Sequence, residues 1–119
     1  MQTTREIPRE QWDAFLADFI DTHRDEAVRV EVAGGDLGDQ QLGSARSLMG
    51  LELEPKGSAK GDLGISLVLK GDAGGVMDHR IHHPEHVYLL EGTDDGVDCL
   101  SIEDQSQRKT MLFVRVAKA

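Results

Sequence analysis

The chain of 119 residues carries 13 Lys and Arg residues against 22 Asp and Glu residues, a formal net charge of −9. This length is close to the commonest size of one globular domain, so we expect a single domain over residues 1–119. The net acidity and the aromatic content of 4% argue against binding to nucleic acid or to an anionic membrane surface. No apolar run is long enough to cross a membrane, and the N-terminus lacks an apolar leader, so we expect a cytoplasmic protein.

The first predicted element is a helix over about residues 8–23. Its apolar residues recur at the spacing of one helical face, namely Trp12, Phe15, Leu16, Phe19 and Ile20. Pro8 suits the first helical position, where a missing backbone N–H costs nothing. We therefore expect this helix to cover the main core.

After the helix the apolar period changes from 3.6 to 2, which indicates strands with one buried face. Val28, Val30 and Val32 show this alternation first, because charged residues separate them. The same reasoning predicts seven strands at about residues 27–32, 49–54, 63–70, 76–81, 87–91, 97–103 and 110–116. Several links between them are short and contain Gly or Asp, which favours hairpin connections.

This order of elements predicts an α+β fold. One N-terminal amphipathic helix packs on an antiparallel meander of six or seven short strands, and periodicity leaves open whether the sheet closes into a barrel. Strands and helices do not alternate, which excludes a parallel doubly wound sheet. An open sheet has edges that need to be covered or paired, and a symmetric homodimer is one solution.

Residues 78–86 form the densest cluster of ionisable side chains. They include four of the five histidines of the chain, namely His79, His82, His83 and His86. Imidazole and carboxylate groups are good ligands for zinc and similar metals, so these histidines, with Asp78 or Glu85, are a candidate divalent-metal site. The spacing matches no established zinc motif, and a solvated turn explains the segment equally. A pH-sensitive surface is another interpretation.

A hydrolase-type enzyme is a further alternative. In it His79 acts as a general base with Asp36 or Asp39 from the Gly-rich loop. The competing interpretation is that these carboxylates only stabilise the loop through hydrogen bonds to its backbone. Cys99 has acidic neighbours in the sequence and is expected to be a packing residue. The Gly-rich loops match no phosphate-binding motif, and we expect no cofactor.

A pattern across the whole chain resembles a known family. It comprises Ile7 to Trp12, Val28 to Val32, Gly35 to Gln40, Leu48 to Leu51, and His79 to Ile81 with Pro84 and Val87. Together these segments are similar to an uncharacterised family of small single-domain bacterial proteins, catalogued as a domain of unknown function. The resemblance implies a stand-alone domain and carries no activity, cofactor or catalytic residue.

The acidity of the chain is unevenly distributed. Residues 81–107 hold seven Asp and Glu residues and no Lys or Arg. This region is the candidate surface for a cation or a basic protein partner, although solubility explains the charges equally. Because no catalytic motif is matched, the sequence favours a non-enzymatic binding or interaction domain over an enzyme.

Overall fold

The computed structural model describes residues 3–34, 40–54, 63–71, 74–91 and 97–115. In these ranges the chain forms eight strands, one 3-10 helical turn and one α-helix. The helical elements are η1 (Arg9–Gln11) and α1 (Trp12–His23). The strands are β1 (Thr3–Ile7), β2 (Ala27–Ala33), β3 (Gln40–Glu54), β4 (Gly64–Lys70), β5 (Val76–His82), β6 (Pro84–Glu91), β7 (Val97–Asp104) and β8 (Lys109–Arg115).

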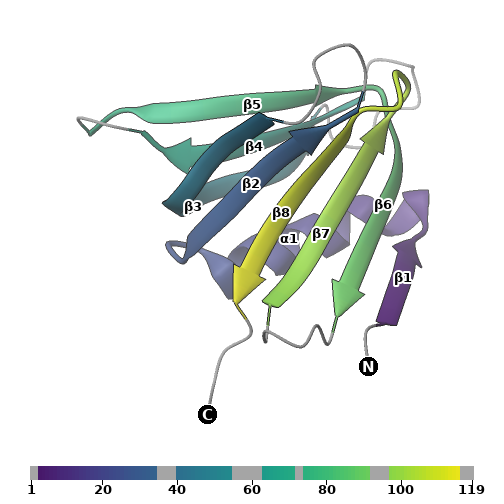
Figure 1. The fold of residues 1–119 in the computed structure, drawn as a ribbon. Coiled ribbons are helices and arrows are strands. Elements are labelled where there is room, and N and C mark those ends of the chain that lie inside the picture. The colour runs from purple at the N-terminus through teal and green to yellow at the C-terminus, as the bar shows by residue number, and fades with distance from the viewer. Residues whose placement is uncertain (1–2, 35–39, 55–62, 72–73, 92–96, 116–119) are drawn as a thin grey trace.

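All eight strands belong to one sheet, in the order β1-β6-β7-β8-β2-β3-β4-β5 (Figure 1). Every neighbouring pair is antiparallel. The long strand β3 pairs with β2 through its first half and with β4 through its second half. The register shifts in both pairings, between Val28 and Glu31 and between Leu48 and Gly50. Such irregularities bend a sheet, so β4 and β5 turn away from the plane of the other strands.

Helix α1 lies across one face of this bent sheet (Figure 1). Its buried side chains, Trp12, Leu16, Phe19 and Ile20, join the apolar residues of the facing strands in one core. The indole Nε1 of Trp12 donates a hydrogen bond of 2.9 Å to the carbonyl oxygen of Ile7. This bond satisfies the polar group of a fully buried ring and fixes the helix to the end of β1.

The predicted α+β fold with six or seven strands is wrong, because the described chain is mainly one eight-stranded antiparallel sheet with a single 12-residue helix. The missed strand is β1, in which Ile7 is the only buried residue. Because its side chains do not alternate between buried and exposed, its sequence shows no apolar period of 2. Only its pairing with β6 identifies it as a strand. The sheet is open within the described residues, with β1 and β5 at its two edges.

The link between β5 and β6 positions the candidate site. These strands are consecutive in the chain but lie far apart in the sheet. His83 makes the bend between them with a φ of 52°, in the left-handed region. Its backbone N–H donates to the carbonyl oxygen of Leu63 at 3.1 Å, and its own carbonyl accepts from the Gln105 N–H at 3.0 Å. The end of β5 is thereby held against the turn between β7 and β8.

Candidate functional site

A cavity of about 180 Å³ lies between β5 and the turn that joins β7 to β8. Strand β5 contributes His79 to its wall, the turn contributes Ser106 and Arg108, and β8 contributes Thr110. These residues are distant in the sequence, and the bend of the sheet brings them together. We call this space the inner cavity.

His79 lies on the inner face of β5, opposite Leu67 of β4. Its Nε2 is 3.4 Å from Oγ1 of Thr110, a buried residue on the facing strand β8. Burial lowers the pKa of His79 below its ordinary value of 6.5, and the neighbouring Arg108 guanidinium lowers it further. The imidazole is therefore neutral at neutral pH and can donate or accept a hydrogen bond.

Arg108 supplies the positive charge of the inner cavity. Its Nε is buried and has no hydrogen-bond partner among the residues that the structure describes. The nearby Asp104 carboxylate is oriented toward the turn, since its Oδ1 accepts the backbone N–H groups of Ser106 at 2.9 Å and of Arg108 at 3.0 Å. A guanidinium cannot lose its proton in a protein, so Arg108 holds a fixed cation with an unused donor.

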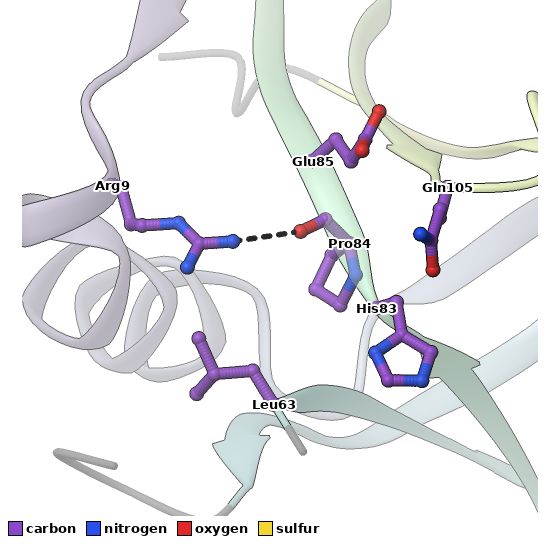
Figure 2. A pocket seen from close by; sticks show the side chains of 6 residues that line it. All are labelled: Arg9, Leu63, His83, Pro84, Glu85 and Gln105. Atoms are coloured by element: carbon purple, nitrogen blue, oxygen red, sulfur yellow. Dashed lines mark hydrogen bonds between the residues drawn. The ribbon is translucent and has the colours of Figure 1, made fainter. Parts of the chain in front are cut away.

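A second cavity of about 370 Å³ lies on the other side of the bend. Figure 2 shows Arg9 and Leu63 on one side of this space, His83 and Gln105 on the other, and Pro84 between them. Nη2 of Arg9 donates to the Pro84 carbonyl oxygen at 3.2 Å. The Arg9 guanidinium also stands 5.0 Å from the centre of the Trp12 ring, an attractive cation–π geometry. We call this space the outer cavity.

The histidine-rich segment divides between different places. His79, His82 and His83 line the inner cavity, and His83 also lines the outer one. His86 lies apart on β6, where its Nδ1 is 2.9 Å from Oε2 of Glu6 and its ring stacks on Tyr88. In the described part of the chain, no three His, Cys, Asp or Glu side chains are grouped so as to hold a metal ion. The structure therefore gives the metal hypothesis no support.

The hydrolase hypothesis also gains no support. Asp36 and Asp39, the proposed partners of His79, lie outside the described residues. Cys99 is buried, and this burial raises the pKa of its thiol to about 11, so it remains protonated at neutral pH. The homodimer and the partner surface over residues 81–107 stay predictions.

Among the residues that line the inner cavity, sequence reasoning missed Arg108 and Thr110, which contribute a buried donor and a buried hydroxyl. Arg108 follows the polar residues 104–107, and these neighbours do not distinguish it from a solvated arginine. Thr110 carried a weak signal, since it shares the alternation of Leu112 and Val114 and therefore belongs to the buried face of its strand. A hydroxyl at a core-facing position needs a partner, which points to a polar site.

Comparison with known proteins places the chain in a family. A family model matches residues 3–119. The chain belongs to the DUF5335 family. This is a family of unknown function, and the resemblance noted from the sequence is confirmed. An uncharacterised protein of Aquifex aeolicus is 25% identical to this DUF5335 chain over 114 residues, which cover 96% of this chain and 94% of the relative.

No solved structure significantly matches this DUF5335 chain. Within the described residues, no helix has the length and apolar character needed to cross a membrane. Because the family carries no established activity, the inner cavity itself is the basis for a functional proposal.

Proposed function

We propose that this DUF5335 protein binds a small oxyanion, a phosphate or carboxylate group, in the inner cavity. The observation that carries the proposal is the buried Nε of Arg108, which lacks a hydrogen-bond partner within the described structure. A buried donor without a partner costs about 1–3 kcal/mol, and more for a charged group. An oxyanion would remove this cost, because its oxygens accept hydrogen bonds from a guanidinium in a matching planar geometry.

The neighbouring groups support the same ligand chemistry. The Thr110 and Ser106 hydroxyls can each donate a hydrogen bond at the cavity wall, and the neutral His79 imidazole can donate one from the ring nitrogen that carries its proton. Arg80 also lines this cavity, but its Nη1 is 3.0 Å from Oε1 of Glu54, so its charge is already paired. Arg108 therefore remains the cation that attracts the anion, in a chain whose overall charge is −9.

Calorimetric titration with inorganic phosphate and with sulfate, at constant ionic strength, tests the proposal. We expect both anions to bind the wild-type protein, and Arg108→Met to weaken this binding by about tenfold to a hundredfold, since a charged hydrogen bond contributes about 1.5–3 kcal/mol. Arg24→Gln is the matched control, because it removes one positive charge from an exposed pair with Asp21. The absence of anion binding to the wild type, or equal losses in both variants, would refute the proposal.

A further inference from the structure

The inner and outer cavities adjoin each other at the bend between β5 and β6. His83 and Gln105 line both of them. The inner cavity, at about 180 Å³, is smaller than the ~300 Å³ at which sites for whole small molecules begin. The outer cavity, at about 370 Å³, lies within the size range of such sites. These sizes suit one ligand with a small head and a larger body.

His83, at the border of the two cavities, is held in a constrained backbone conformation. His83 adopts a left-handed φ of 52°, which costs a residue with a side chain about 1 kcal/mol. Its N–H and carbonyl are both used, in hydrogen bonds to Leu63 and Gln105. Such strain persists only where the surroundings enforce it, and it is common at binding sites. Here it sets the imidazole at the border that the two cavities share.

The outer cavity offers both donors and acceptors of hydrogen bonds. Arg9 donates, the exposed Glu85 carboxylate accepts, and the Gln105 amide can do both. Among the described residues on its wall, Leu63 and Pro84 alone have purely apolar side chains (Figure 2). An apolar body would leave the polar groups unpaired. Arg9 and Glu85 carry opposite charges on the same wall, so their fields offset each other and the outer cavity favours neither a second anion nor a cation.

A neutral body rich in hydroxyl groups satisfies all of these side chains, because each hydroxyl both donates and accepts. We propose that the ligand is a sugar or polyol that carries one phosphate or carboxylate group. The anionic head binds Arg108 in the inner cavity, and the hydroxylated body extends past His83 to Glu85 and Arg9 in the outer cavity. This inference rests on the proposed function, since it assigns the head to the same oxyanion site.

Titration of the full-length protein with glucose-6-phosphate, gluconate, inorganic phosphate and glucose tests the inference. We expect glucose-6-phosphate or gluconate to bind at least about tenfold more tightly than inorganic phosphate. The tighter of the two identifies the head as phosphate or carboxylate, and either result supports the proposal. Glucose alone should bind more weakly than both.

Variants locate the body of the ligand. Glu85→Ala should remove most of the gain of the sugar derivative over inorganic phosphate and leave phosphate binding unchanged, and Gln105→Ala should reduce the same gain. Glu52→Ala is the matched control, because it removes an exposed carboxylate from β3, outside both cavities. If phosphate binds as tightly as both sugar derivatives, the inference fails and the proposed function stands. If none of the anions binds, both fail.

Discussion

His79 and His86 belong to the same nine-residue segment, yet their surroundings are opposite. His79 lies on the inner face of β5, where burial and then Arg108 lower its pKa. The exposed His86 lies on the outer face of β6, where the hydrogen bond to Glu6 raises its pKa. The bend at His83 places the two histidines on different faces of the sheet. Nearness in the sequence therefore did not make these residues into one site.

The largest expected difference between the two regions is in packing. Leu67 is buried directly opposite His79, whereas the half-buried Tyr88 stacks on His86 at the surface. Leu67→Ala should lower the free energy of unfolding by about 2–5 kcal/mol, since it leaves a cavity in the core. Tyr88→Ala should lower it by only about 1 kcal/mol. Urea denaturation measures both free energies of unfolding. Similar losses in the two variants would contradict the assignment of the His79 surroundings to the core and of the His86 surroundings to the surface.

Substitutions of two arginines near His79 should change the free energy of unfolding in opposite directions. In buffer without phosphate, sulfate or carboxylate ions, Arg108→Met should raise the free energy of unfolding by about 1–3 kcal/mol, because it removes a buried donor that has no partner within the described structure. Arg80→Met removes an exposed ion pair with Glu54 and should lower stability by at most about 1 kcal/mol. Thermal denaturation in chloride buffer compares them. A loss of stability in Arg108→Met would show that its guanidinium is paired in solution.

Acid titration should separate the two histidines. The folded-state pKa of His79 lies below 6.5, so the unfolded chain binds more protons and stability falls as the pH decreases below about 6.5. The folded-state pKa of His86 is raised, so its contribution is present below about 6.5 and is lost as the pH rises through the folded-state value. Proton NMR should show His79 titrating below His86, and the reverse order would contradict the structure.

The same experiment with variants assigns the effects. His79→Gln should reduce the loss of stability at acid pH, and His86→Gln should increase it. The charged and titratable groups that act on His79 are Arg108, Asp78, His82 and Asp104. Glu6, Glu103 and Glu85 act on His86. Because these surroundings share no residue, the two substitutions should act additively in the double variant.

The smallest expected effect concerns the bend itself. His83→Gly should raise stability by about 0.5 kcal/mol, because it relieves about 1 kcal/mol of left-handed strain and gives back part of this through the greater freedom of the unfolded chain. His83→Ala keeps the strain and should gain nothing. Equal melting temperatures of the two variants would show that His83 does not hold a positive φ in solution.

Side-chain periodicity carried much of the information about the elements. Trp12, Leu16 and Phe19 are buried on one face of α1, and Val28, Val30 and Val32 are buried on one face of β2, as their spacing predicts. The strand Thr3–Ile7 could not be found in this way, because its identity depends on a partner strand far along the chain. The first part of β3 was missed for the same reason, since residues 40–46 lack apolar alternation.

The candidate site was predictable only in part. The histidines indicated the correct segment of the chain for the candidate site, because His79, His82 and His83 line the inner cavity. Their relation to Arg108 and Thr110 was hidden, since it arises from the curvature of the sheet across β3 rather than from any local pattern. Strand pairing brings together only residues on neighbouring strands. Bending of the sheet also brings together residues on strands that do not pair, such as β5 and β8.

The pairing of β1 with β6 has a consequence for the order of folding. Thr3 lies opposite Glu91 and Ile7 lies opposite Val87. Strand β1 can therefore pair only after β6, about 80 residues later in the chain, has been synthesised. During synthesis β1 leaves the ribosome long before its partner exists, and contacts of such sequence separation form slowly. Helix α1 follows directly and anchors Ile7 through Trp12. Strand β1 can therefore be held near its final position before β6 is available to pair with it.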